Sequence, residues 1–350
     1  MQRGSGSSFG VSSLLVAMSV LAGCGGEIEP SGNLNKSNRL NVVQNRGTLI
    51  CGINGQLPGF SFVTESGDYA GMDVDLCRAI AAALFDDPEQ VEYVSLSSQE
   101  RFTAVQTGEV DVLNRNTTWT LSRETAVGMG FGPTIFYDGQ GMMVPQDSPI
   151  SSLADLEGKT ICVKAGTTTE LNLEDQLSRR DIDYQPVIIE DDDALFAAYA
   201  EQRCDAVTAD RSQLVVQRER FEVPSSHRFL ETLLSKEPLG AVVAAGDASW
   251  LSAVRWITNV LIQAEEFGIT SENLDSFLET DNPEIRRILG LEGTLGDDMG
   301  LPPDFAVRVI RAVGNYDEIY ERNIGQPYQL DRGLNQLWSE GGLLYSPPFR

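Results

Sequence analysis

From Leu49 onward, the chain alternates short apolar runs with amphipathic segments, and this alternation restricts the possible folds more than any other feature. Short apolar runs between polar residues are typical of buried strands, and longer segments with one apolar face are typical of helices. The expected strands cover residues 49–53, 91–96, 110–113, 160–164, 184–189, 206–209 and 239–244. Strands that alternate with helices predict an α/β fold with largely parallel sheets.

Polar residues mark where several of the helices begin. Asp73 can cap the helix that follows the first strand. Ser97 and Glu100 have the spacing of a capping box, and Gly108 ends that helix. We interpret the acids at 191–193 as a cap with favourable charges at the start of a helix rather than as a metal site. Helices are also expected over residues 168–177, 194–202, 250–266, 283–289 and 302–313, so the C-terminal part is mostly helical.

The N-terminus has the pattern of a bacterial lipoprotein signal. Arg3 precedes an apolar stretch over residues 11–21, which ends in Leu-Ala-Gly-Cys at Cys24 and is too short to stay in a bilayer as a spanning helix. Residues 1–23 are therefore a predicted signal peptide, with a plain secretory signal as the alternative. We expect Cys24 to be lipidated and residues 24–38, rich in Gly, Ser and Asn, to be a flexible tether. This predicts a periplasmic or otherwise extracytoplasmic protein that lipid attaches to a membrane.

Composition argues against several classes of function. The formal net charge of −25 argues against a nucleic-acid partner, because binding phosphates requires clustered Lys and Arg. The single histidine, His227, excludes a multi-histidine metal centre and lies in a polar Ser-Ser-His-Arg segment, so we expect neither a catalytic role for it nor a metal or cofactor for the protein. About 310 residues follow the tether, which favours two domains.

Four cysteines remain besides Cys24, and an even number in an oxidising compartment favours disulfides. Metal binding is the weaker alternative, because there is no Cys-x-x-Cys spacing. Of the three possible pairings, the local pattern favours Cys51 with Cys77, which place a strand beside the apolar face of the next helix. It likewise favours Cys162 with Cys204, which flank two strand starts.

Two polar segments follow predicted strands, at the edge where open α/β sheets bind ligands. One is Asn-Arg-Asn-Thr-Thr-Trp-Thr-Leu-Ser-Arg at 114–123, and the other is Ala-Gly-Thr-Thr-Thr-Glu at 165–170. Gly166 allows close approach of the backbone, and the helix start after it offers free N–H groups to an anion. Asp210 ends a further strand. An arginine with helix-start amides suits a carboxylate and an aspartate suits an ammonium group, so the pattern favours a zwitterionic ligand.

Together with Tyr-Asp-Gly-Gln-Gly at 137–141, Leu-Asp-Arg-Gly-Leu at 330–334 and Pro-Pro-Phe at 347–349, these segments resemble the general L-amino-acid-binding proteins of ABC importers, within solute-binding protein family 3. The resemblance runs from about Arg39 to the C-terminus. It implies a two-lobed type II periplasmic-binding fold with a helical C-terminal extension. The chain would cross between lobes near 137–141 and 241–245, so that residues 39–137 and 243–350 form lobe 1 and residues 138–242 form lobe 2.

The resemblance also implies roles for single residues. It places the carboxylate-binding arginine at Arg123, with Asn116 and Thr118 as companions, a second-lobe carboxylate donor at Thr168, and the ammonium acceptor at Asp210. The expected side-chain pocket is Asn54, Leu57 and Ser98. Relatives restricted to cationic amino acids resemble this chain but carry an acid near the Asn54 position, so its absence favours broad specificity for L-amino acids.

The implied partners are an L-amino acid and the membrane subunits of an ABC permease, and we expect a monomer without enzymatic activity. An alternative is an enzyme, since dehydratases of prephenate or arogenate resemble this fold. Such an enzyme needs a carboxylic acid beside the leaving hydroxyl, for which Glu170 is the candidate. A sensor ectodomain is the other alternative, and it would need a transmembrane helix and a cytoplasmic module.

Overall fold

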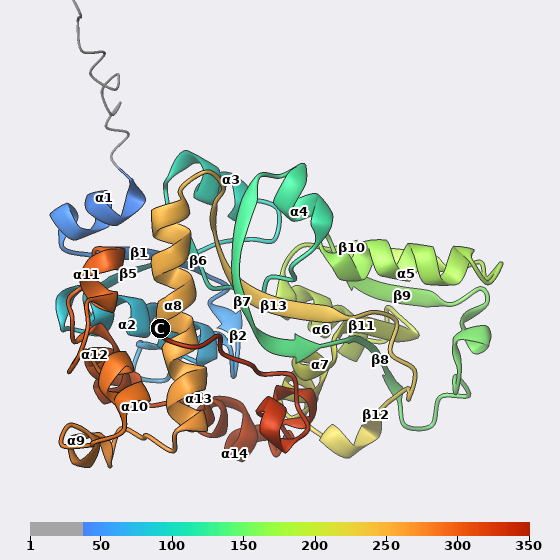
Figure 1. Cartoon of the computed structure of the whole chain (residues 1–350). Helices are drawn as coiled ribbons and strands as arrows, with labels where there is room; N and C mark the ends of the chain where they lie inside the picture. The colour runs from blue at the N-terminus through green and yellow to red at the C-terminus, as the bar shows by residue number, and fades with distance from the viewer. Residues whose placement is uncertain (1–37) are drawn as a thin grey trace, which may run out of the picture. The chain divides into compact units, whose positions relative to one another are not determined.

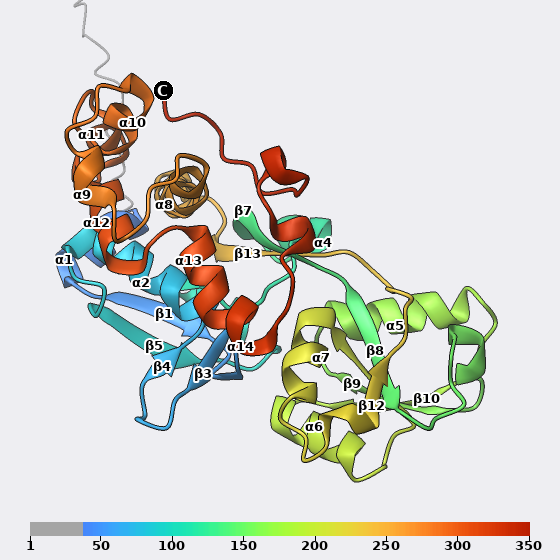
Figure 2. The ribbon, with the colours of Figure 1, turned by 90° about the horizontal axis from the view of Figure 1, so that it is seen from below.

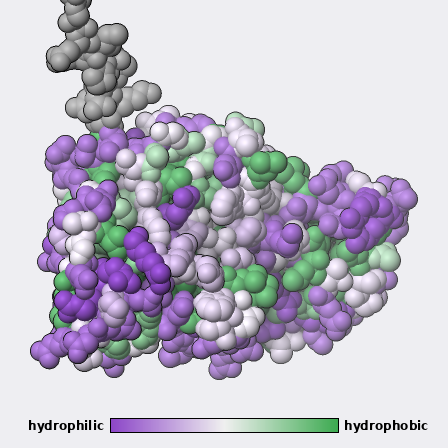
Figure 3. Space-filling view, in the orientation of Figure 1, coloured by the Kyte–Doolittle hydropathy of each residue, from purple (hydrophilic) through white to green (hydrophobic). Residues whose placement is uncertain are grey.

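The computed structural model describes residues 38–350. The predicted signal peptide, the predicted lipidation site at Cys24 and the predicted tether up to residue 37 lie outside the described residues. Within the described part of the chain, no helix is both long and apolar enough to cross a membrane. On the face shown in Figure 3, hydrophilic residues surround scattered groups of apolar ones.

The first sheet has five strands in the order β5-β1-β6-β13-β7 (Figure 1). They are β1 (Leu49–Ile53), β5 (Val91–Ser95), β6 (Val112–Leu113), β7 (Met129–Asp138) and β13 (Glu237–Ala244). β1 pairs in parallel with β5 and β6, whereas β13 pairs antiparallel with β6 and β7. A further small antiparallel sheet, which the sequence patterns did not predict, contains β2 (Gln56–Leu57), β3 (Ser61–Val63) and β4 (Tyr69–Ala70).

The second sheet has the order β10-β9-β11-β8-β12. Its strands are β8 (Gln140–Pro145), β9 (Thr160–Lys164), β10 (Gln185–Ile189), β11 (Ala206–Asp210) and β12 (His227–Phe229). The β9 pairs are parallel and the β8 pairs are antiparallel. The prediction of largely parallel sheets therefore holds only for the strands that helices connect. β7 runs almost directly into β8, and β13 returns beside β7, and strands joined in this way need no crossover helix.

The chain passes from the first sheet to the second between Asp138 and Gln140, within the predicted crossing. The second crossing, predicted near residues 241–245, is wrong. β13 begins at Glu237 and pairs with β7 of the first sheet from that residue onward, so the chain has returned to the first sheet before Glu237. The apolar pattern marked only residues 239–244, because Glu237 is a charged residue that the fold nevertheless buries to 1% exposure. We call the first sheet with its helices lobe 1 and the second sheet with its helices lobe 2.

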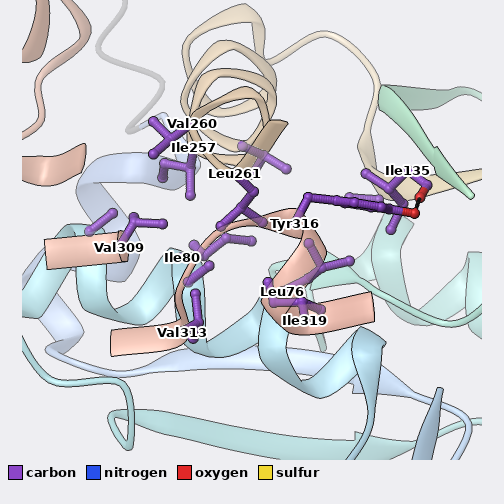
Figure 4. Close-up of a cluster of buried hydrophobic side chains, with 14 of the residues drawn as sticks. Leu76, Ile80, Ile135, Ile257, Val260, Leu261, Val309, Val313, Tyr316 and Ile319 are labelled. Atoms are coloured by element: carbon purple, nitrogen blue, oxygen red, sulfur yellow. Dashed lines mark hydrogen bonds between the residues drawn. The ribbon is translucent and has the colours of Figure 1, made fainter. Parts of the chain in front are cut away.

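Helices of lobe 1 build the larger core (Figure 4). Leu76 and Ile80 of α2 (Met72–Phe85) meet Ile257 and Leu261 of α8 (Ala248–Glu266). The Tyr316 hydroxyl ties this core to the first sheet by donating to the Ile135 carbonyl at 2.7 Å. The other helices of this lobe are α1 (Arg39–Arg46), α3 (Arg101–Thr107), α4 (Leu121–Thr125), α9 (Leu274–Phe277), α10 (Pro283–Ile288), α11 (Leu295–Met299), α12 (Phe305–Val313), α13 (Tyr316–Tyr320) and α14 (Gln326–Tyr328). The predicted helical C-terminal extension is therefore present.

Lobe 2 buries both faces of its sheet under helices (Figure 2). On one face, Leu173 and Leu177 of α5 (Thr168–Ser178) pack against the sheet. On the other face, Leu195 of α6 (Asp192–Ala200) and Leu214 of α7 (Arg211–Arg218) do the same. The alternation of strand and helix in this part of the chain was therefore predicted well.

Two of the three predicted caps form. The Ser97 hydroxyl accepts from the Glu100 N–H while the Ser97 N–H donates to the Glu100 carboxylate, both at 3.2 Å, which is the predicted capping box. Asp191 caps α6 by accepting from the Ala194 N–H at 2.8 Å. Asp73 does not cap α2, because its carboxylate instead accepts from the Asn116 N–H at 3.2 Å.

Both predicted disulfides are present, Cys51 with Cys77 and Cys162 with Cys204. The first joins β1 to α2 in lobe 1, and the second joins β9 to the segment just before β11 in lobe 2. Each bridge therefore stabilises one lobe by itself, and neither of the two bridges joins the lobes to each other.

Candidate functional site

One cavity, of about 30 Å³, is lined by residues of both lobes, and we call it the main cavity. Its lining residues from lobe 1 are Ser98, Arg101, Arg115, Asn116, Thr118 and Arg123. Its lining residues from lobe 2 are Lys164, Thr167, Thr168, Thr169, Ala209, Asp210 and Gln213. Strand ends and helix starts supply these residues, as expected for ligand sites at the edges of α/β sheets.

Three arginines of lobe 1 form what we call the donor wall: Arg101, Arg115 and Arg123, which are 3%, 2% and 7% exposed. Arg115 donates to the Leu96 carbonyl at 2.8 Å and to the Ser98 hydroxyl at 3.2 Å, and Arg123 donates to the Thr118 carbonyl at 2.7 Å. Burial lowers the pKa of all three guanidinium groups, to about 10 for Arg123. Three buried like charges favour an anionic group in the cavity.

The local sequence fixes this wall. Thr120 caps α4 by accepting from the Arg123 N–H at 3.3 Å, and the Trp119 N–H donates to the Pro238 carbonyl at 2.8 Å. These bonds hold the segment 116–120 against the first residues of β13. Behind the wall, burial raises the pKa of Asp73 to about 7, opposed by the Asn116 N–H and by Arg115.

Lobe 2 presents a helix start to the same cavity. Thr167 caps the 11-residue α5 by accepting from the Glu170 N–H at 3.2 Å, so Thr168 and Thr169 lie in its first turn. The N–H groups of a first turn have no partner inside the helix and favour an anion. Gly166, with φ of +68°, brings this turn close to lobe 1, since a Cβ there would lie 3.1 Å from the Gln99 side chain.

A second group of residues in the main cavity, Thr118, Thr168 and Asp210, offers hydrogen-bond acceptors where the donor wall offers donors. We call this group the acceptor corner. The Thr118 and Thr168 hydroxyls donate to the Glu237 carboxylate at 2.6 and 2.8 Å, and their oxygens lie 3.3 Å apart. Asp210 is 7% exposed, and no side chain in residues 38–350 forms a hydrogen bond or salt bridge with its carboxylate. Burial and the neighbouring Asp138 and Glu237 raise the pKa of Asp210 well above its ordinary value.

A second cavity of about 360 Å³, which we call the side chamber, adjoins the main cavity and shares Arg115 and Lys164 with it. Its other lining residues are Asn54, Gly55, Gln56, Ser95, Leu96, Ser97, Glu190 and Asp191. Between the two lies Asp192, to which Lys164 and Gln213 donate from lobe 2 and Asn54 donates from lobe 1 at 3.0 Å. Burial opposes ionisation of Asp192, but Lys164 holds its pKa below the ordinary value.

Comparison with known proteins places this geometry in a family. The model for bacterial extracellular solute-binding proteins, family 3, matches residues 49–289. The chain belongs to this family. Its fold is accordingly the two-lobed periplasmic-binding fold.

Several family members are similar over nearly their whole length. The general L-amino acid-binding periplasmic protein AapJ of Rhizobium johnstonii is 48% identical over 315 residues, which are 89% of this chain and 92% of that one. The glutamate/glutamine/aspartate/asparagine-binding protein BztA of Rhodobacter capsulatus is 48% identical over 314 residues, which are 89% and 93% of the two chains. A solved periplasmic binding protein of Brucella ovis with glutathione bound has a TM-score of 0.87 and 46% identity, and the match covers 90% of this chain and 100% of that one.

Of the eight residues predicted to bind ligand in this family-3 protein, six line the main cavity: Ser98, Asn116, Thr118, Arg123, Thr168 and Asp210. Asn54 lies beside it in the side chamber. Leu57 lies in the core of lobe 1 with no exposed surface, so it cannot face a ligand.

The residues predicted from the sequence did not include Arg101, Arg115, Lys164 or Glu237. Arg101 had a usable signal, because it is buried with Ala104 and Val105 on one face of α3. Lys164 also had one, as a cation that ends the buried strand β9. Glu170, the acid considered for the enzyme alternative, accepts from the Gly166 N–H at 2.8 Å and so closes the turn before α5.

Proposed function

We propose that the protein captures L-amino acids outside the cytoplasmic membrane and delivers them to the membrane subunits of an ABC importer. The observation that carries this proposal is the meeting of the donor wall with the unpaired Asp210 in one cavity between the lobes. Arg123 and the first-turn amides of α5 suit an α-carboxylate, and Asp210 suits an α-ammonium group. The relatives AapJ and BztA, which are named as amino-acid-binding proteins, support it.

The site also suggests which amino acids bind best. With Arg123 assigned to the α-carboxylate, we assign the other two arginines of the cavity, Arg101 and Arg115, to the ligand side chain, while Lys164 is paired with Asp192. We therefore infer broad specificity with a preference for acidic side chains and their amides. Arginine and lysine should bind most weakly, because the donor wall would repel their charges.

Isothermal titration calorimetry of the metal-free protein against the proteinogenic L-amino acids tests both points. We expect glutamate, aspartate, glutamine and asparagine to bind most tightly. Small-angle scattering should show compaction when a bound amino acid is added, because the ligand would join groups of both lobes. Absence of binding to every amino acid would contradict the proposal, and binding without compaction would contradict closure.

A second candidate ligand is glutathione, which is bound in the Brucella ovis structure. The γ-linked glutamyl residue of glutathione keeps a free α-carboxylate and α-ammonium group, so it could occupy the main cavity as glutamate would. The rest of the tripeptide would then need further space, and the side chamber adjoins the cavity on the side of Arg115 and Lys164.

Because the side chamber would be needed for glutathione but not for glutamate, a substitution there can test the two ligands independently. Gln56 is exposed and lines only the side chamber, so Gln56→Trp should fill that space and leave the main cavity intact. We expect the variant to lose glutathione binding and to keep glutamate binding. If the wild-type protein does not bind glutathione, or if Gln56→Trp binds it unchanged, this candidate fails.

The anchor and the oligomeric state belong to the same proposal. Cys24→Ala should abolish lipidation and leave the protein released or unprocessed, and mass spectrometry of the native protein tests this. An unmodified N-terminus elsewhere would contradict the lipoprotein assignment. Light scattering of the purified protein should give the mass of one chain.

A further inference from the structure

Glu237 is a buried residue near the main cavity that has no role in the proposed amino-acid site. Several polar side chains nevertheless donate hydrogen bonds to its carboxylate. It is the first residue of β13, 1% exposed, and pairs in register with Asp138 of β7 at the passage between the lobes. It does not line the main cavity. A buried carboxylate at such a place either serves the fold or controls its neighbours.

Four side chains donate to this carboxylate, and the geometry separates them into two pairs. Asn172, at 2.8 Å, and Ser235 donate to Oε1. Thr118 of lobe 1 and Thr168 of lobe 2 donate to Oε2, at 2.6 and 2.8 Å. In both bonds the threonine hydroxyl is the donor and the carboxylate oxygen the acceptor, so both hydroxyl protons point at Glu237.

This arrangement changes what the two threonines can offer a ligand. A hydroxyl has one proton, and once the proton is donated only its lone pairs remain available. Thr118 and Thr168 therefore face the main cavity as acceptors, 3.3 Å apart, and Asp210 adds a third acceptor. An ammonium group has three N–H donors, which matches three acceptors, whereas a ligand carboxylate would be repelled.

We propose that Glu237 is a positioning residue that makes the acceptor corner selective for the ligand's α-ammonium group. It acts through the threonine hydroxyls and does not touch the ligand. The inference rests on the proposed amino-acid function and changes one part of it, since the resemblance placed Thr118 and Thr168 beside the carboxylate. The α-carboxylate is left to Arg123 and the backbone amides of α5.

Glu237→Gln tests this by reversing the polarity with almost no change in shape. Asn172 and Ser235 still need an acceptor, so the amide oxygen stays at the Oε1 position and the NH₂ group faces the threonines. The NH₂ group then donates to the hydroxyls, and their protons turn toward the cavity. The probes are L-glutamate and glutarate, which share both carboxylates and differ in the α-ammonium group.

Calorimetry, with displacement titration for weak binding, should show that Glu237→Gln weakens L-glutamate by about tenfold or more and does not weaken glutarate. The matched control is Glu265→Gln, which alters another largely buried carboxylate, bound to Arg332 and distant from the main cavity, and should change neither affinity. Equal weakening of both ligands by Glu237→Gln would show a merely structural role and overturn the inference. Failure of the wild-type protein to bind any amino acid would instead overturn the proposed function.

A double-mutant cycle covers the case in which glutarate does not bind measurably or Glu237→Gln does not fold. Thr168→Val removes one acceptor hydroxyl at nearly constant volume, so it should weaken L-glutamate, and Glu237→Gln should have a smaller further effect in that background than in the wild type. Additive effects would contradict the inference. If Glu237→Gln does not fold, Thr118→Val and Thr168→Val must each weaken L-glutamate for the inference to stand.

Discussion

The donor wall and the acceptor corner differ in where their residues come from. Arg101, Arg115 and Arg123 all belong to lobe 1, whereas the acceptor corner joins Thr118 of lobe 1 to Thr168 and Asp210 of lobe 2. A ligand carboxylate can therefore meet its main partner on lobe 1 alone, but an ammonium group meets its full set only when the lobes come together. The comparison suggests that charge attracts the ligand to lobe 1 and that the ammonium group favours closure.

Removing Arg123 should have the largest effect. Arg123→Ala leaves the α-carboxylate without its charge partner in a desolvated cavity, which costs about 2–5 kcal/mol, or at least roughly thirtyfold in affinity. Calorimetry across ligand classes should show this loss for every amino acid. Arg311→Ala, on the surface of α12, is the control. A class of amino acids spared by Arg123→Ala would refute the assignment of the carboxylate to Arg123.

Removing the charge of Asp210 should weaken binding comparably and also change its pH dependence. Burial and the neighbouring acids raise the pKa of Asp210, so protonation of its carboxylate competes with an incoming ammonium group. Affinity in the wild type should therefore rise as the pH rises through this raised pKa. In Asp210→Asn the affinity should be low and this rise absent. If Asp210→Asn keeps the wild-type pH dependence of affinity, Asp210 does not bind the ammonium group.

Arg101→Met should have a smaller and selective effect. Burial and the like charges of Arg115 and Arg123 lower the pKa of Arg101, so the fold should tolerate its loss. We expect glutamate and aspartate to bind roughly tenfold more weakly, with little change for uncharged amino acids. Titration of one acidic and one apolar amino acid is sufficient. Equal losses for both would mean that Arg101 does not face the ligand side chain.

Asn54→Asp should have the smallest effect on ligand choice. Asn54 donates to Asp192 across the lobes, and an aspartate there would place two carboxylates together. Closure should become less favourable for all ligands alike, because two buried carboxylates that share a site oppose each other's ionisation. A gain for arginine and lysine with a loss for glutamate would instead show that Asn54 faces the ligand side chain, as the sequence predicted.

The structure places six of the eight residues that the sequence predicted to bind ligand around the main cavity, and their role in binding stays a prediction. Arg123 and Asp210 follow from motifs that end strands or begin helices, and local sequence determines such positions. Leu57 was misplaced because an apolar residue beside a loop gives no sign of whether it faces a cavity or the core. Glu237 could not be predicted, because its role depends on hydroxyl groups 119 and 69 residues away. The return of β13 to the first sheet was misjudged for the same reason, since its first residue is charged yet buried.

The most direct test of the account is a crystal structure of the protein with L-glutamate. The account predicts that the α-carboxylate binds Arg123 and the first turn of α5, and that the α-ammonium group contacts Asp210 and the hydroxyls of Thr118 and Thr168. The side-chain carboxylate should point toward Arg101 and Arg115. An ammonium group placed away from Asp210, or a carboxylate bound by the threonine hydroxyls, would contradict it.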